Sequence, residues 1–190
     1  SSNPLEKIGR YFAAGKIRSS FTKILEQLKS FTETSSNLYG MKINNTKVKD
    51  QFLVSIKESL NKAPANSTIY SLIEELEYYI NQQNAKPTAH PMLHVDSSNT
   101  KYEVMVAIPV NKPLQGNSRI QPKRMVLGNI LEAEVKGGPE AIKKGKIELN
   151  NYREDYDRTS PAIPYESLVT NRLQERDSSK WITRLYYPVF

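Results

Sequence analysis

Glu166 is the residue whose type and position point most directly to chemistry. The second half of the 190-residue chain repeats the pattern of the first, and an offset of 73 positions aligns Glu166 with Leu93. Strand alternation places Glu166 on the same face as Leu168, so a charged side chain has an apolar neighbour. A carboxylate there loses hydration and needs hydrogen bonds or a positive partner. On the residues alone an ordinary solvent-facing Glu is the commoner case, and a carboxylate in a binding site is the alternative.

Metal and cofactor chemistry find no support in the sequence. The chain has no Cys, which excludes disulfides, thiolate ligands and thiolate nucleophiles. Its two His residues, His90 and His94, flank Pro91 in an extended segment, so their spacing does not align them on one face. The run at 137–139 (Gly-Gly-Pro) lacks a phosphate-loop pattern and is interpreted as a turn before a helix. We therefore expect no cofactor and no metal.

The composition indicates a globular protein with an uneven charge distribution. Hydrophobic residues make up 38% of the chain, and no apolar run approaches the roughly 20 residues of a membrane span. The net charge is +7, of which residues 1–31 contribute +4. The sequence begins without Met, which predicts that a natural N-terminal segment, an anchor or an upstream domain, has been removed. We expect a cytoplasmic location.

Residues 5–31 predict one amphipathic helix, followed by a hinge up to residue 37. The apolar residues Ile17, Phe21, Ile24, Leu28 and Phe31 are spaced by four, three, four and three, which forms one stripe. The basic residues do not cluster along one face, so a solvated helix docked by its stripe is favoured over a nucleic-acid-binding arm.

Residues 38–190 predict a series of strands and helices. Apolar and polar residues alternate within residues 39–60, which predicts two short strands. A helix capped by Ser67 or Thr68 follows. That helix has one apolar face opposite its glutamates. The remaining expected elements are strands at 91–95 and 102–110, strands at 119–127 and 129–136, a helix at 139–156, and strands at 163–170 and 181–189.

The order strand-strand-helix-strand-strand occurs twice, which suggests an internal duplication. The offset of 73 aligns Tyr79 with Tyr152, and the last strands match at an offset of 79 because the second half has a polar insertion at 171–180. We expect copies at 38–111 and 118–190, paired about a pseudo-twofold axis with a groove between them. The predicted fold is α+β, with antiparallel sheets and helices packed on one side.

Three segments resemble the GyrI-like (gyrase-inhibitor-like, AraC-type effector-binding) domains. They are Ala107-Ile108-Pro109-Val110, Val135-Lys136-Gly137-Gly138-Pro139, and the closing stretch from Pro164-Tyr165-Glu166 through Trp181 to Tyr186-Tyr187-Pro188-Val189. The resemblance covers about residues 38–190 and implies a small-molecule-binding domain of the kind found in bacterial multidrug-sensing and transcription regulators. It also implies that Glu166 lines the ligand site. Leu168 and Glu140 depart from the family pattern, which usually has an aromatic residue and a Tyr at these positions.

The expected ligand site combines this resemblance with the predicted groove. Its candidate residues are Glu166, Tyr79, Tyr152, Glu140, Tyr102, Trp181 and Tyr186. For Tyr79 and Tyr152 the alternative is packing in the core.

We expect the chain to sense or sequester a small hydrophobic or cationic ligand, with Glu166 opposing the ligand's charge. One alternative is hydrolysis of electrophilic small molecules with Glu166 as general base. A second is a regulatory module of a nucleic-acid-binding protein, in which this domain itself contacts no nucleic acid. Residues 4–31 are weakly similar to the last helix of a START-like domain, which predicts such a domain upstream.

Overall fold

The computed structural model describes residues 4–49, 52–98 and 101–190. The chain divides into two compact units, one up to Lys42 and the other from Ile43 to Phe190. No helix in the described part of the chain combines the length and the apolar character needed to cross a bilayer.

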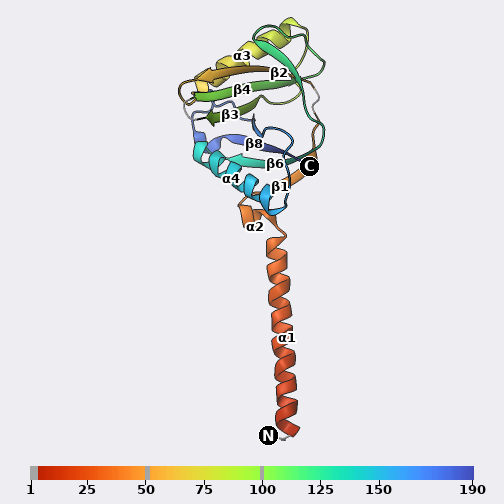
Figure 1. Ribbon diagram of the computed structural model, residues 1–190. Helices are drawn as coiled ribbons and strands as arrows, with labels where there is room; N and C mark the ends of the chain where they lie inside the picture. Colours follow the sequence, from red (N-terminus) through yellow and green to blue (C-terminus); the bar gives the residue numbers. More distant parts are fainter. Residues whose placement is uncertain (1–3, 50–51, 99–100) are drawn as a thin grey trace. The chain divides into compact units, whose positions relative to one another are not determined.

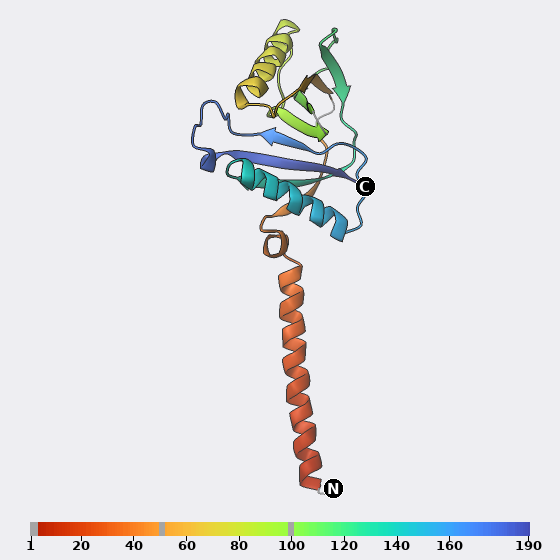
Figure 2. The same cartoon turned by 60° about the vertical axis from the view of Figure 1, so that its left-hand side comes forward.

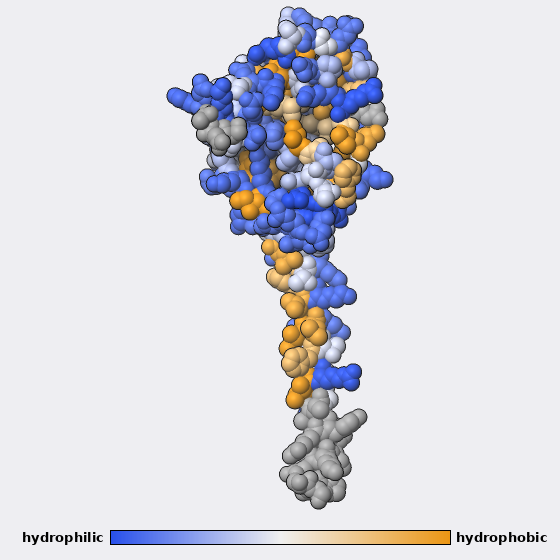
Figure 3. All heavy atoms as spheres, in the orientation of Figure 1, coloured by the Kyte–Doolittle hydropathy of each residue, from blue (hydrophilic) through white to orange (hydrophobic). Residues whose placement is uncertain are grey.

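The first unit consists of two helices, α1 (Pro4–Thr32) and α2 (Ser35–Tyr39). Helix α1 confirms the predicted helix almost to the residue. Gly40 ends α2 with a φ of 66°, a left-handed conformation that Gly adopts without steric cost. The apolar stripe is not packed within this unit: Ile17, Phe21, Ile24, Leu28 and Phe31 are each more than half exposed, and Figure 3 shows apolar side chains along this helix.

The second unit is built on one antiparallel sheet of eight strands in the order β1-β6-β8-β7-β3-β4-β2-β5 (Figure 1). Their bounds are β1 Ile43–Lys47, β2 Phe52–Leu60, β3 Met92–Ser98, β4 Lys101–Val110, β5 Ile120–Arg124, β6 Asn129–Lys136, β7 Tyr165–Leu168 and β8 Ile182–Val189. Counted inward from one edge the order is β1, β6, β8, β7, and from the other edge it is β5, β2, β4, β3. Corresponding strands of the two halves therefore occupy corresponding places in the sheet. The predicted α+β class is confirmed, although the strands form a single sheet.

The first strand of each half pairs with the other half. Strand β1 pairs with β6, and β5 pairs with β2. At each edge of the sheet, the outermost strand thus comes from one of the predicted segments, 38–111 or 118–190, and pairs with a strand of the other. Strands β1 and β5, which form the two edges, are each five residues long. Strand β5 contains Pro122, which suits an edge strand because Pro has no backbone N–H to donate to a neighbouring strand.

Two helices cover one face of this sheet. Helix α3 (Asn66–Gln82) packs on β2 and β4, and α4 (Pro139–Asp155) packs on β6 and β8 (Figure 2). The predicted apolar face of α3 is confirmed, because its residues Ile69, Leu72, Ile73, Leu76 and Ile80 are buried. They pack on alternate strand residues such as Val54 and Ile56, whereas Leu53 belongs to a separate cluster on the opposite face.

The start of α3 differs from its prediction. Its N-cap is Ala65, which makes no side-chain capping bond, and Ser67 and Thr68 lie inside the first turn. Packing of the apolar face therefore outweighs the capping preference in setting the first residue of this helix.

The two halves meet at a narrow seam between β3 and β7. Only two residue pairs join these strands, Met92 with Ser167 and Leu93 with Glu166. Cross-strand partners point to the same face, so the two residues aligned by the offset of 73 are direct neighbours on the face that carries α3 and α4.

Candidate functional site

A groove of about 440 Å³ lies over the seam, between the first turns of α3 and α4. Its lining residues are Pro64, Asn66, Ile69, Leu93, Val95, Pro139, Ile142, Lys143, Lys146, Glu166, Arg172 and Trp181. Both helices and both central strands contribute, so the groove exists only when the two halves are assembled.

Glu166 forms the polar floor of the groove. The residue is 6% exposed, and each oxygen of its carboxylate meets a different cation. Lys146 Nζ lies 2.7 Å from Oε1, and an Arg172 guanidinium nitrogen lies 2.9 Å from Oε2. These charge-assisted contacts replace the water that burial removes. The predicted need for a positive partner is met by two residues of the chain itself.

Arg172 is as deeply buried as the carboxylate that it contacts. The same guanidinium nitrogen donates to Thr183 Oγ1 at 3.0 Å, and its guanidinium carbon lies 5.2 Å from the centre of the Trp181 ring. The indole nitrogen of Trp181 in turn donates to the Glu175 carbonyl at 2.8 Å. Loop 171–180, predicted only as a polar insertion, thus provides a buried cation and the support for a buried aromatic ring.

Tyr70 of α3 fixes the backbone that carries Arg172. Its hydroxyl accepts from the Arg172 backbone N–H at 2.8 Å and donates to the Thr170 carbonyl at 3.1 Å. Burial raises the pKa of the Tyr70 hydroxyl, opposed by its hydrogen bond and its Coulomb interaction with Arg172. The first half therefore holds the loop of the second half in place.

The N-terminus of α4 is set against the groove by its Gly-Gly-Pro sequence. Gly137 has a φ of 132°, which disfavours a side chain, and its N–H donates to the Trp181 carbonyl at 2.8 Å. Pro139 then occupies the first turn of the helix, where no backbone N–H is required. This confirms the structural interpretation of the motif.

Two of the predicted site residues, Glu166 and Trp181, line the groove together. Glu140 lies beside it in the first turn of α4, but its side chain is exposed and not part of the lining. Tyr102 is the second residue of β4, opposite Leu60, and likewise lies outside the lining.

The other three predicted tyrosines are placed by packing. Tyr79 packs against the α3 core, and its hydroxyl donates to the Gln115 carbonyl at 2.6 Å. Tyr152 lies 4.5 Å from Tyr156 between ring centres. Tyr186 stacks on Tyr165 at 5.0 Å and lines hollows other than the groove; burial raises the pKa of its hydroxyl. None of the three lines the groove.

The sequence did not reveal the cations of the site. Arg172 lies in a loop without periodicity, so nothing local marked it. A signal did exist for Lys146, because the offset of 73 aligns it with Ile73, which is buried in α3. Like Glu166, Lys146 is a charged residue that replaces an apolar one.

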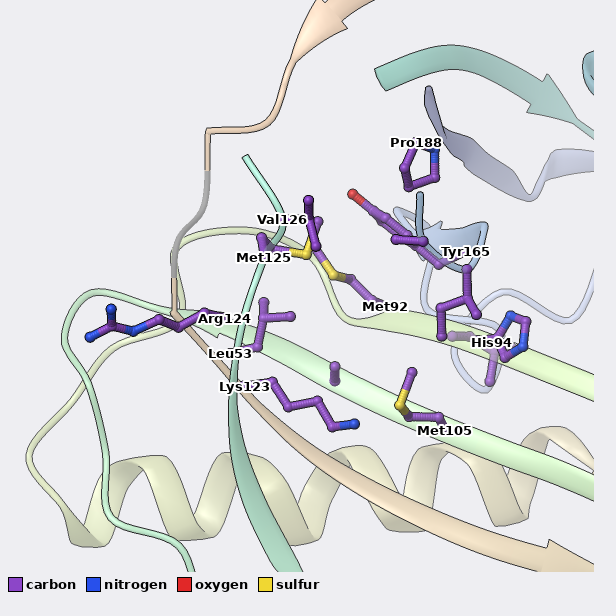
Figure 4. A pocket seen from close by; sticks show the side chains of 14 residues that line it. Leu53, Met92, His94, Met105, Lys123, Arg124, Met125, Val126, Tyr165 and Pro188 are labelled. Carbon is purple, nitrogen blue, oxygen red and sulfur yellow. The ribbon is translucent and has the colours of Figure 1, made fainter. Parts of the chain in front are cut away.

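A second hollow, of about 220 Å³, lies on the opposite face of the sheet. Figure 4 shows its labelled side chains on the side of the strands away from the helix, among them Met92, Met105, Met125 and Tyr165. Its lining is mainly apolar, and Lys123 and His94 are among its few polar members. Among the described residues that line it, none forms an ion pair like those of the groove.

Neither a protein-family profile nor a curated protein matches this sequence. Solved structures do match. The crystal structure of the EcmrR C-terminal domain has a TM-score of 0.66 at 16% identity, covering 79% of this chain and 98% of that chain. EcmrR in a cryo-EM complex with DNA has a TM-score of 0.67 at 16% identity, covering 100% of this chain and 72% of that chain. This chain shares their fold.

Two further structures show the range of proteins that use this fold. SAV2435 bound to tetraphenylphosphonium has a TM-score of 0.50 at 17% identity, covering 79% of this chain and 94% of that chain. A hydrolase from Listeria innocua has a TM-score of 0.58 at 10% identity, covering 78% and 92%. At these identities the likeness establishes the fold of the chain and leaves its activity to the site.

Proposed function

We propose that residues 43–190 act as a GyrI-like effector-binding domain that senses or sequesters a small, largely apolar molecule in the groove. The observation that carries this proposal is the buried Glu166–Arg172 pair at the floor of a groove that also has apolar walls. Buried charges are costly to maintain and are concentrated at functional sites. The bound tetraphenylphosphonium of SAV2435, a protein with this fold, supports the same use of the fold here.

The groove can provide useful affinity through apolar contact alone. A flat ligand that buries ~200 Å² of apolar surface gains on the order of 5 kcal/mol before the cost of association. The half-buried Val95 and the edges of the mostly buried Ile69, Leu93 and Ile142 form the apolar walls, from both halves. The charged floor would then determine which polar group the ligand carries.

We also propose that the two halves arose by duplication of one unit. The mirrored strand order and the direct pairing of Leu93 with Glu166 support this proposal. Under it, the groove lies on the pseudo-twofold axis, where substitution of one position changes one side of the site only.

Hydrolysis is less well supported by the geometry. A general base needs a carboxylate that can take a proton from water, whereas both oxygens of Glu166 already contact cations. A regulatory role in a DNA-binding protein has more support, because the match to DNA-bound EcmrR extends over the whole chain, α1 included.

The proposal is tested by filling the groove. Val95→Trp places a large ring in it, and Met105→Trp is the matched control in the hollow on the opposite face. We expect fluorescence titration with 1-pyrenebutanol, a neutral apolar probe, to show at least tenfold weaker binding to Val95→Trp, because the ring occupies the ligand's volume. Binding to Met105→Trp should stay unchanged.

The two variants should first show wild-type circular dichroism and a cooperative unfolding transition. If Val95→Trp binds the probe as tightly as the wild type, or if the wild type binds no apolar probe, the groove is not the ligand site and the proposal is wrong.

A further inference from the structure

We propose that the groove selects apolar molecules that carry an acidic group, such as an aryl carboxylate or sulfonate. This inference rests on the proposed function and specifies the class of ligand. It reverses the charge preference predicted from Glu166 alone.

The charges that line the groove sum to a positive value. Lys143, Lys146 and Arg172 contribute three positive charges and Glu166 one negative charge, so the lining carries +2. Residues 43–190 as a whole carry +3, the +7 of the chain less the +4 of residues 1–42, so most of the net charge of this unit lies at the groove. A cation entering the groove would meet net repulsion.

Glu166 is not available to neutralise a cationic ligand. Each of its oxygens is within 3 Å of a cationic nitrogen, and Arg172 is further fixed by Thr183 and Trp181. A cationic ligand would have to displace Lys146 or Arg172. Displacing Arg172 would leave a buried guanidinium unpaired, which is strongly unfavourable.

Among the described residues that line the groove, Lys143 is the cation without an ion pair. It lies three residues before Lys146 in α4, so both side chains share one face of the helix and both line the groove. In the described part of the chain, Lys143 makes no ion pair. An acidic group beside it could also contact Lys146, whose side chain is 48% exposed and so remains reachable from the groove.

The start of α4 adds to the same preference. Pro139 lines the groove at the first residue of this 17-residue helix, and the N-terminal end of a helix carries partial positive charge. Glu140 in the first turn opposes this effect, but its side chain is not part of the lining. The geometry thus combines apolar walls with one positively charged side.

The test uses three probes with the same apolar body: 1-pyrenebutyrate, 1-pyrenebutanol and 1-pyrenebutylammonium. We expect the acid to bind the wild type about tenfold more tightly than the alcohol and the amine more weakly than the alcohol, because a charge-assisted hydrogen bond contributes that much. Lys143→Met should reduce binding of the acid about three- to tenfold and leave the alcohol unchanged. Lys144→Met, one residue along the helix and outside the groove lining, is the control and should have no effect.

Glu166→Gln provides the opposite test. Removing the carboxylate charge frees Lys146 and Arg172, so the acid should bind this variant several-fold more tightly. If Glu166 instead served a cation, the same change would leave the acid unaffected.

The inference is overturned if the wild type binds the amine as tightly as the acid, or if Lys143→Met weakens acid and alcohol equally. Such results leave the proposed function intact as long as Val95→Trp still abolishes binding. If no probe binds in the groove, the proposed function itself is wrong. Val95→Trp and Met105→Trp locate each probe and so separate these cases.

Discussion

The two halves contribute differently to the groove, although some of its positions match at the offset of 73. The first half provides Pro64, Asn66, Ile69, Leu93 and Val95, whereas the second provides the charged residues Lys143, Lys146, Glu166 and Arg172 beside Pro139, Ile142 and Trp181. At matched positions, buried Leu93 faces buried Glu166 across the seam. The first half thus places an apolar side chain at the seam, while the second half places there the carboxylate that the lysine and the arginine contact.

The helices show the same difference. Helix α3 buries apolar side chains along its whole length, whereas α4 buries only Ile142, Gly145 and Leu149. A helix with fewer packing positions has more positions free to change, and two lysines of the groove lie on it. We infer that the second half can alter its charges at little cost to the shared core.

The largest effect should come from making the second half resemble the first. Glu166→Leu copies the residue of the first half, but it leaves Arg172 buried without its carboxylate. Removing one partner of a buried ion pair typically costs about 3–5 kcal/mol, and we expect a loss of this size in the free energy of unfolding, measured by urea titration.

The double variant Glu166→Leu/Arg172→Leu should recover at least half of that loss, because no unpaired charge remains. Glu134→Leu is the matched control, since its carboxylate pairs with Arg184 on an exposed part of the sheet and should contribute less than about 1 kcal/mol. Equal losses for Glu166→Leu and Glu134→Leu would contradict the difference between the groove and the surface.

A smaller effect should follow from cutting the hydrogen bonds by which the first half holds the second. Tyr70→Phe removes the hydroxyl that contacts Thr170 and Arg172. Two lost hydrogen bonds should reduce the free energy of unfolding by about 1–2 kcal/mol. The groove should also bind ligands less tightly, because the backbone of Arg172 is no longer fixed.

The stabilisation that the Tyr70 hydroxyl provides should be lost at alkaline pH. Burial raises the pKa of Tyr70 above its ordinary value of about 10. The folded state therefore favours the protonated hydroxyl, and the stabilisation is fully present below that ordinary value and declines as pH rises through the folded pKa. The difference in unfolding free energy between wild type and Tyr70→Phe should shrink above pH ~10; a difference that stays constant would contradict the assignment.

The smallest effect concerns the exposed end of the insertion that only the second half possesses. Hydrogen bonds from Ser179, first from its hydroxyl and then from its backbone N–H, lower the pKa of Asp177. The stabilisation is present above the ordinary pKa of an Asp and is lost as pH falls through the folded pKa. We expect Asp177→Asn to lower the melting temperature slightly at pH 7 and by less at pH 3. Equal shifts at both values would show that the carboxylate charge is irrelevant.

Local pattern predicted most of the elements because each depends on neighbouring residues. The apolar stripe of α3 and the alternation of β2 and β4 are set by which side chains must leave water, and the structure places these helices and strands close to their predicted bounds. The alignment of the two halves at an offset of 73 also pointed to Glu166, and this residue lines the groove together with Trp181. The tyrosines were harder to place, because an aromatic residue fits a core or a ligand site equally well.

The sequence by itself determined the fold class, the order of the elements and the position of a buried carboxylate, because burial and periodicity are local properties. Only the tertiary structure decided which groups meet that carboxylate. Arg172 reaches Glu166 through a loop held by Tyr70, more than a hundred residues earlier in the chain, and Lys146 reaches it from a helix on the same face. The charge of a site is the sum of side chains brought together from distant segments, and Glu166, predicted to oppose the charge of a cationic ligand, is the floor of a groove whose lining carries a net positive charge.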